Sequence, residues 1–176
     1  MITLLYAHPQ PDRSIGGRRL VEAVRDLPGL AVRSLYDLYP DFAIDVVAER
    51  EALDSTRLLV WQHPLHWYGV PALLKLWFDD VLTEGWAFGS RRALAGKDCL
   101  WVTTTGGGTD AFTAGGRHGH PFEAFVAPLA QTARFCGMNF LAPFVVYGSH
   151  QLAPDALDRH AQAYRTLLAD YLARHG

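Results

Sequence analysis

The sequence predicts a single α/β domain with a parallel sheet, and three observations support this prediction. Short apolar runs alternate along the chain with segments whose apolar residues recur at helical spacing. Turns that contain glycine or proline separate the two kinds of segment. The chain has 176 residues, the length of one domain, and neither a repeat nor a linker divides it. Strands that alternate with helices favour a parallel sheet with right-handed crossovers and helices on both faces.

Five strands are expected where short apolar runs are bounded by turn residues. They cover residues 2–7, 30–35, 57–62, 99–103 and 140–147. The last of them contains Pro143, which a strand tolerates only near its start or at a sheet edge.

Helices are expected from near Ser14 to the Pro28-Gly29 turn and over residues 46–53, 71–82, 128–135 and about 155–173. Ser14 is typical of a helix start and Gly137 of a helix stop. Segments 36–45, 85–98 and 104–120 are expected to be loops, and residues 121–125 are ambiguous. The helix over residues 71–82 has more large apolar residues, Trp77 and Phe78 among them, than one buried stripe requires.

The composition excludes several classes of function. The formal net charge of −2 gives no electrostatic reason to expect nucleic acid or an anionic membrane as a partner. Cys99 and Cys136 are too few for a disulfide framework, and each lies in an apolar run that favours burial. The first apolar run is too short for a signal peptide, and no stretch reaches membrane-spanning length. A cytoplasmic location is therefore expected.

The stretch over residues 58–71, LLVWQHPLHWYGVP, predicts a ligand site. A buried strand ends near Gln62, and ligands of parallel sheets bind just past the carboxyl ends of the strands. His66, Trp67 and Tyr68 are therefore expected near a ligand, and their flat rings on a glycine-containing turn suit a flat aromatic one. The alternative is a strand-to-helix corner filled by aromatic side chains.

Two further loops are expected at the same edge of the sheet. In the loop over residues 8–17, the Ser14 hydroxyl and the free N–H groups of the following helix turn could hold a phosphate, with His8 as a further donor. The alternative is an ordinary helix cap beside a surface histidine. In the TTTGGG loop over residues 103–108, consecutive glycines let the backbone approach a ligand closely. Neither GxGxxG nor GK[ST] is present, and a flexible lid is the alternative.

Four motifs resemble the flavodoxin-like NAD(P)H:quinone oxidoreductases. These are YAHPxP followed by a serine, WQHPLHWYGVPALLKLWFDDV, GWAFG and TTTGGG, and they span nearly the whole chain in order. Together with LYPDFAID, they are most similar to a short bacterial branch, the ancillary proteins of glutathione-regulated potassium efflux systems.

The resemblance implies a flavodoxin-like three-layer sandwich whose five-stranded sheet has the order 2-1-3-4-5. It also implies a bound flavin, NADH or NADPH as co-substrate, a quinone or another small electron acceptor, and a homodimer that shares its active sites. FMN is expected rather than FAD, because the chain ends soon after the fifth strand and its helix. A potassium efflux transporter's cytoplasmic domain is an implied partner, which would place the protein peripherally at the inner membrane.

The resemblance also implies roles for individual residues. His8, Ser14, Ile15, Gly16 and Gly17 would face the flavin phosphate; Leu65, His66, Trp67 and Tyr68 would meet the isoalloxazine edge through backbone groups; Thr104, Thr105, Gly106 and Gly107 would bind its pyrimidine end. Family members often have an asparagine two or three residues after the serine, where this chain has Gly16 and Gly17.

His118 is the expected catalytic residue. Better-known members of the family have a tyrosine and a histidine after the glycine-rich loop, which stabilise charge on the reduced flavin. The histidine corresponds to His118, but the tyrosine position is Phe112, which cannot donate a hydrogen bond. The alternative for His118 is a solvated loop histidine.

The resemblance favours an enzyme, and a regulatory subunit that activates a transporter is the alternative function. A flavodoxin-like electron carrier is disfavoured, because such carriers are usually strongly acidic and this chain is close to neutral. No Ser-His-Asp or Cys-His constellation requires a protein nucleophile. The eight histidines lack HExxH or paired CxxC spacing, so no metal site is expected.

Overall fold

A computed structural model describes residues 1–175. The strands are β1 Ile2–Tyr6, β2 Leu30–Ser34, β3 Leu58–Pro64, β4 Asp98–Thr104, β5 Asn139–Phe140 and β6 Phe144–Val146. The α-helices are α1 Ile15–Val24, α2 Leu35–Leu38, α3 Val46–Asp54, α4 Ala72–Val81, α5 Glu123–Phe135 and α6 Pro154–His175. Two short 3₁₀ helices, η1 Pro11–Arg13 and η2 Thr109–Ala111, lie in the loops after β1 and β4.

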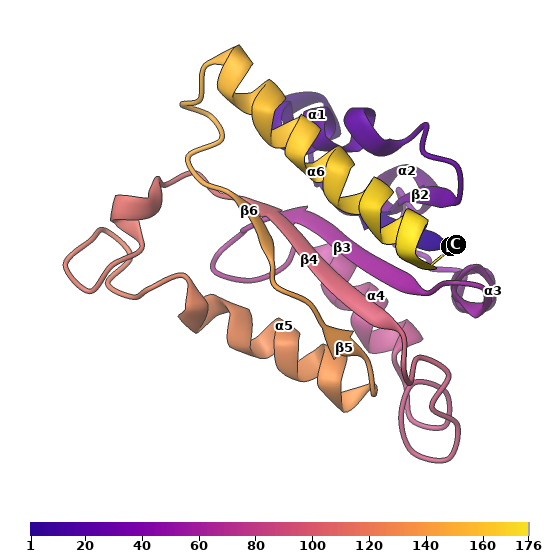
Figure 1. Cartoon of the computed structure of the whole chain (residues 1–176). Coiled ribbons are helices and arrows are strands. Elements are labelled where there is room, and N and C mark those ends of the chain that lie inside the picture. The colour runs from indigo at the N-terminus through magenta and orange to yellow at the C-terminus, as the bar shows by residue number, and fades with distance from the viewer. Residues whose placement is uncertain (176) are drawn as a thin grey trace.

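The sheet is parallel and has the order β2-β1-β3-β4-β5, with β6 also paired to β4. Helices α1 and α6 cover one face, and α4 and α5 cover the other (Figure 1). The predicted flavodoxin-like three-layer arrangement and strand order are therefore confirmed.

The central strands are apolar on both faces because both faces are covered. Leu4, Val60 and Leu100 are neighbours across β1, β3 and β4, and they pack beneath α1 and α6. The alternate residues Leu5 and Trp61 face α4 on the opposite side. Continuous burial of these strands explains why the sequence shows apolar runs rather than strict alternation.

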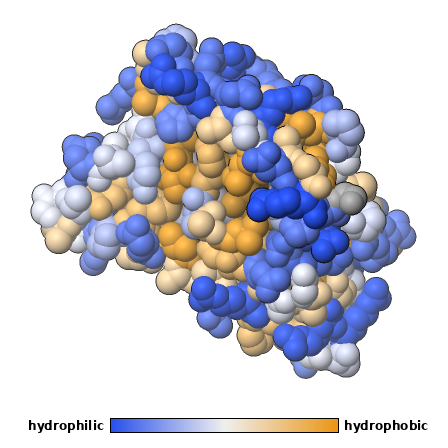
Figure 2. All heavy atoms as spheres, in the orientation of Figure 1, coloured by the Kyte–Doolittle hydropathy of each residue, from blue (hydrophilic) through white to orange (hydrophobic). Residues whose placement is uncertain are grey.

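The predicted strand over residues 140–147 is in fact two strands, β5 and β6. Phe140 pairs with Cys99 and Phe144 pairs with Val102, so residues 141–143 between them interrupt the ladder. Pro143 has no N–H to donate, which accounts for the break immediately before β6. Figure 2 shows apolar side chains gathered at this open edge of the sheet, between α5 and α6.

Helix boundaries differ from the prediction at three places. Helix α1 ends at Val24, before the Pro28-Gly29 turn that was expected to end it. Helix α5 begins at Glu123, so Pro128 lies inside it rather than at its start. The first turns of a helix contain N–H groups without partners, and a proline just beyond them removes only one further bond. The predicted loop over residues 36–45 contains most of the short helix α2.

A buried carboxylate organises the layer that contains α4. The side chain of Glu49 is fully buried and accepts hydrogen bonds from Arg33 Nε at 3.0 Å, Tyr39 Oη at 2.6 Å and Trp77 Nε1 at 2.8 Å. Trp77 is fully buried within the chain, so its side chain is not available for contact with a second subunit. Phe78 is half-buried and its ring packs 4.8 Å from that of Trp61.

Candidate functional site

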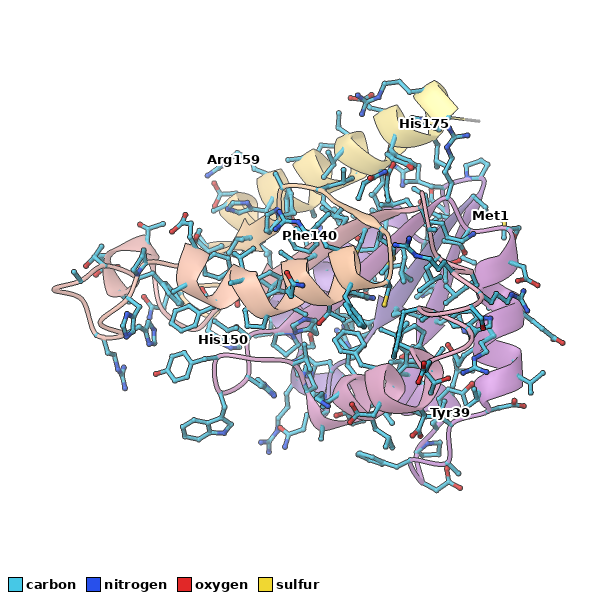
Figure 3. All side chains as sticks on the ribbon, turned by 90° about the horizontal axis from the view of Figure 1, so that it is seen from below. Met1, Tyr39, Phe140, His150, Arg159 and His175 are labelled. Atoms are coloured by element: carbon cyan, nitrogen blue, oxygen red, sulfur yellow. The ribbon has the colours of Figure 1, made fainter. Side chains whose placement is uncertain are left out.

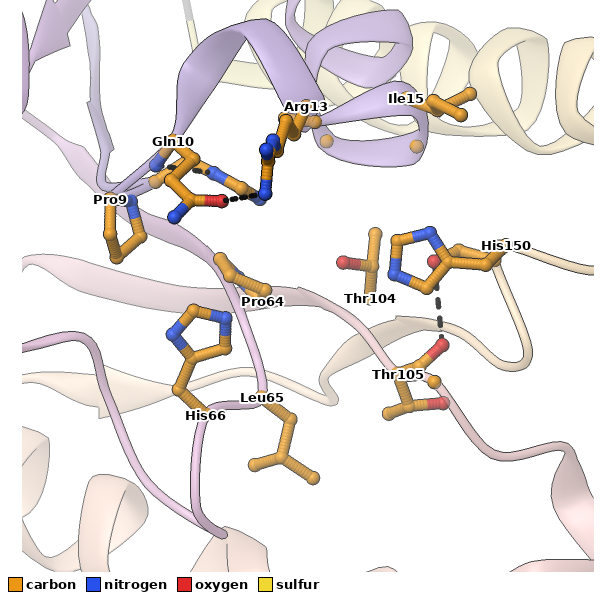
Figure 4. A pocket seen from close by; sticks show the side chains of 16 residues that line it. Pro9, Gln10, Arg13, Ile15, Pro64, Leu65, His66, Thr104, Thr105 and His150 are labelled. Atoms are coloured by element: carbon orange, nitrogen blue, oxygen red, sulfur yellow. Dashed lines mark hydrogen bonds between the residues drawn. The ribbon is translucent and has the colours of Figure 1, made fainter.

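The carboxyl ends of the strands meet at one edge of the sheet, where a cavity of about 550 Å³ lies. Met1 precedes β1 and His150 follows β6, so in this parallel sheet His150 lies at the carboxyl ends of the strands, where it lines the cavity (both residues are labelled in Figure 3). The three predicted loops contribute His8, Leu65, His66 and residues 14–17 and 104–106 to its lining (Figure 4). The structure therefore brings the three loops together around one cavity.

The first turn of α1 forms one wall of this cavity. Ser14 occupies the N-cap position, but its Oγ makes no capping bond and is a buried atom without a hydrogen-bond partner among the described residues. The preceding segment is braced internally, because Gln10 N–H donates to Nδ1 of His8 at 3.1 Å. The first N–H groups of the helix have no intrahelical acceptors and carry the positive end of its dipole. This wall suits an anion.

Close packing explains the two glycines in this turn. A Cβ on Gly16 would lie 3.0 Å from Cβ of Ser149, and a Cβ on Gly17 would lie 2.7 Å from Oγ of Ser14. Gly17 is also held from below, since Nε2 of Gln62 donates to its carbonyl at 2.8 Å. The absence of the family's asparagine at these positions therefore has a steric reason.

The aromatic turn after β3 is a two-residue hairpin. Gly69 N–H donates to the His66 carbonyl at 2.9 Å, and His66 N–H donates back at 3.2 Å. Trp67 and Tyr68 lie between them and have φ of 47° and 63°. Residues other than glycine and asparagine rarely adopt this region of backbone conformation. Trp67 is 95% exposed, and neither Trp67 nor Tyr68 lines the cavity. The N–H of Leu65 is bonded to the Thr104 carbonyl at 2.9 Å.

The glycine-rich loop is tied to a fourth loop that the sequence reasoning missed. Residues 148–150 follow β6, and Gly148 N–H donates to the Gly107 carbonyl at 2.8 Å. Ser149 bonds to the Thr105 carbonyl through its N–H at 2.9 Å and its hydroxyl at 3.3 Å. Ser149 and His150 thereby line the cavity. The signal was available, since a Gly-Ser-His turn after the last strand must emerge at the same edge.

The ionisable side chains around the cavity are all basic. Arg13, His8, His66 and His150 line it, and within residues 1–175 no aspartate or glutamate does. Burial lowers the pKa of His8, and the charges of His66 and His150 lower it further. Burial also lowers the pKa of His66. These imidazoles are thus close enough to repel one another when protonated, which an anion between them would relieve.

His118 lies outside this cavity, on the other side of the glycine-rich loop. It borders a second hollow of about 690 Å³, and a Cβ on Gly107 would lie 2.9 Å from its Nε2. Its ring lies 4.4 Å from that of Phe112, and its Nδ1 lies 3.4 Å from Oη of Tyr68. Tyr68 in turn stacks on Phe125 with ring centroids 5.1 Å apart. His118 and Tyr68 are thus brought together although the cavity excludes both.

The fold, together with the cavity at the carboxyl ends of the strands, indicates the class of protein. The profile of a family described as "Flavodoxin-like fold" matches residues 1–168, and the chain belongs to that family. A relative from Citrobacter koseri, "Glutathione-regulated potassium-efflux system ancillary protein KefF", is 47% identical over 178 residues and covers 100% of both chains. The chain therefore belongs with these ancillary proteins.

Solved structures of two other proteins share this fold over nearly the whole chain. General stress protein 14 from Treponema denticola, in complex with FMN, has a TM-score of 0.90 at 33% identity and covers 97% of this chain and 98% of its own. An NADPH-quinone reductase from P. pentosaceus has a TM-score of 0.87 at 29% identity, over 95% of this chain and 96% of its own. In the described part of the chain, no helix is long and apolar enough to cross a membrane.

The residues at the cavity fit a phosphorylated flavin. Within residues 1–175, the buried Ser14 Oγ has no hydrogen-bond partner, and the adjacent helix turn offers free N–H groups. Residues 104–106 also line the cavity, and Gly106 has no side chain to obstruct a flat ring there. No carboxylate among residues 1–175 opposes a phosphate there.

Proposed function

We propose that this chain is an FMN-dependent NAD(P)H:quinone oxidoreductase. The observation that carries the proposal is the cavity itself, which is lined both by the helix turn at Ser14, whose free N–H groups suit an anion, and by residues 104–106 of the TTTGGG loop. The NADPH-quinone reductase of similar structure and the FMN complex of a second similar protein support the same cofactor and reaction class.

The first and third loops would hold the two ends of the cofactor. Ser14, His8 and residues 15–17 would bind the phosphate, and residues 104–107 would bind the pyrimidine end of the ring. Leu65, His66, Trp67 and Tyr68 would border its edge. When bound, FMN supplies the chemistry, accepting a hydride from the nicotinamide and delivering two electrons to a quinone.

The protein's own contribution to the reaction is positioning and local charge. His118 would donate a proton or stabilise negative charge at the ring, with Tyr68 Oη at 3.4 Å from its Nδ1. We expect ping-pong kinetics, because the nicotinamide must leave before the quinone can occupy the same stacking site.

The active assembly would be a homodimer, in line with the family resemblance. Helix α4 presents half-buried Phe78 to a hollow that it shares with Phe88 and Phe135. Phe135 is 58% exposed, which is unusual for a large apolar side chain unless another surface covers it.

Cofactor extraction combined with a turnover assay tests the proposal. The purified protein should release FMN, identified against FMN, FAD and riboflavin standards, and should oxidise NAD(P)H only when a quinone is present. Release of FAD at full occupancy would exclude FMN as the cofactor. Bound FMN without any quinone-dependent oxidation would exclude the enzymatic function.

The second candidate function is that of an ancillary subunit of a potassium efflux transporter, with redox activity secondary. Full-length identity of 47% to a protein of that name favours it. The transporter's cytoplasmic domain would dock away from the cavity, since substrates need that edge open.

A pull-down with the cytoplasmic domain of a transporter encoded beside this protein separates the two candidate functions. Ser14→Asp should oppose the flavin phosphate and abolish NAD(P)H oxidation while the folded variant still co-purifies with that domain. If neither the wild type nor the folded variant binds, the ancillary function is excluded and the enzyme stands alone.

A further inference from the structure

We infer that Arg13 and His150 select a phosphate monoester over an uncharged flavin, an inference that rests on the proposed function. Neither residue belongs to the motifs that carry the family resemblance. Arg13 ends η1, and His150 follows β6, so they come from opposite ends of the chain. Figure 4 shows both side chains at the cavity, approaching it from different sides.

Within residues 1–175, the Arg13 guanidinium has no carboxylate partner, unlike the arginines of this chain that form ion pairs. Arg18 pairs with Glu22, and Arg19 pairs with Asp158. In the described residues, the only side-chain bond of Arg13 is to Oε1 of Gln10, at 3.4 Å. A guanidinium without a carboxylate at the mouth of a cavity is free to bind a phosphate through two N–H groups.

His150 is brought to the cavity by the missing side chain of Gly16. A Cβ at Gly16 would lie 3.0 Å from Cβ of Ser149 and 3.3 Å from Cγ2 of Thr104. With glycine there, the 148–150 loop packs against the first turn of α1, and the bonds from Gly148 and Ser149 to the glycine-rich loop fix it. Gly16, which stands where family members often have an asparagine, thus leaves room for the loop that contains His150.

The two side chains complement the donors already present at the helix turn. The N–H groups of residues 15–17 approach an anion from the helix side only. Arg13 adds a permanent positive charge, and the His150 imidazole offers an N–H donor in either of its protonation states. His8 and His66 line the same cavity, so the anion would be surrounded by donors, and no carboxylate among the described residues lines the cavity.

Arg13 and His150 should distinguish FMN from riboflavin, because only FMN has a phosphate. FMN and riboflavin share the ring and the ribityl chain and differ only by the phosphate. Contacts to the ring should therefore bind both, whereas Arg13 and His150 should contribute only to FMN. Loss of a charge-assisted hydrogen bond should weaken FMN binding by about 10- to 100-fold for Arg13→Gln and by about tenfold for His150→Gln.

Equilibrium titration of the flavin-free protein, followed by flavin fluorescence, tests this inference without measuring turnover. Kd is measured for FMN and riboflavin with the wild type, Arg13→Gln, His150→Gln and the double variant. Arg18→Gln and His120→Gln serve as controls, because both residues are exposed and lie outside the cavity. Circular dichroism verifies that each variant is folded.

The expected result is a wild-type preference for FMN that each variant reduces while its riboflavin Kd stays within about twofold of wild type. Unchanged FMN affinity in both folded variants would overturn the inference, and so would equal loss of FMN and riboflavin. A wild-type protein that binds FMN no better than riboflavin would also overturn it. Failure of the wild type to bind either flavin would instead contradict the proposed function.

Discussion

The Tyr68 hydroxyl lies 3.4 Å from Nδ1 of His118, joining the turn after β3 to the loop after β4. The neighbouring ring of Phe112, 4.4 Å from that of His118, has no hydroxyl. Tyr68 thus places beside His118 the hydroxyl that Phe112 cannot provide. Tyr68 has a positive φ of 63°, so the backbone conformation of the turn directs its side chain towards His118.

We predict that His118 assists turnover without being essential. His118→Ala should lower kcat by about 100-fold, the low end for acid–base assistance, and Tyr68→Phe should lower it less. Flavin content should not change in either variant, because His118 lies outside the cavity and Tyr68 would meet the flavin through backbone groups that Tyr68→Phe retains. Steady-state kinetics, with His120→Ala as the control for a nearby loop histidine, provide the measurement. An unchanged kcat would make His118 an ordinary solvated residue.

We predict that His63 makes the fold less stable in acid. Burial lowers its pKa to about 4, and the charge of His66 adds to this effect, while the bond to the Pro64 carbonyl opposes it. The unfolded chain binds a proton near pH 6.5 that the folded chain accepts only near pH 4. Stability is therefore lost as pH falls through this window, by about 3 kcal/mol in total.

The comparison of wild type with His63→Gln isolates this effect. The free energy of unfolding is measured in urea at several pH values from 7 to 4, a range chosen to span roughly the two pKa values. The difference between wild type and variant should shift in favour of the variant as pH falls. Parallel pH curves for the two proteins would show that His63 is not the group responsible.

We predict that Glu49 is essential for stability. Glu49→Ala should lower the free energy of unfolding by roughly 3–5 kcal/mol, because it leaves the Arg33, Tyr39 and Trp77 donors without their buried acceptor. The control is Glu51→Ala, since Glu51 is exposed on the same helix. Equal urea midpoints for the two variants would contradict a structural role of the buried carboxylate.

We predict that substitutions at adjacent positions of α4 have different consequences. Trp77→Glu should prevent folding, because Trp77 is fully buried and donates to Glu49. Phe78→Glu should dissociate a homodimer into folded monomers, because Phe78 is half-buried at the hollow beside Phe135. Analytical ultracentrifugation and circular dichroism distinguish these results. A fully active wild-type monomer would exclude a shared active site.

Much of the fold could be predicted because local patterns and topology agree. Strands β1 to β4 are apolar runs buried on both faces, and parallel order places the loops after β1, β3 and β4 at one edge. The cavity lined by His8, Ser14, His66 and Thr104 follows from that rule alone.

The remaining features depend on contacts that are distant in sequence. The break at Pro143 between β5 and β6 is revealed only by their separate pairing with β4, whereas the 148–150 loop could have been placed at the site edge by the rule used for the other three loops. Burial of Trp77 depends on a carboxylate at Glu49 on another helix. The exposure of Trp67 depends on a hairpin with two positive φ values, a conformation that its residue types do not indicate.

The most direct test of the proposed function is to follow the two half-reactions separately without oxygen. NAD(P)H added to the FMN-loaded protein should bleach the visible flavin absorbance, and a quinone added afterwards should restore it with matching stoichiometry. Both steps should be fast enough to account for steady-state turnover. Absorbance that NAD(P)H does not bleach, or that a quinone fails to restore, would contradict the assignment of this chain as a quinone oxidoreductase.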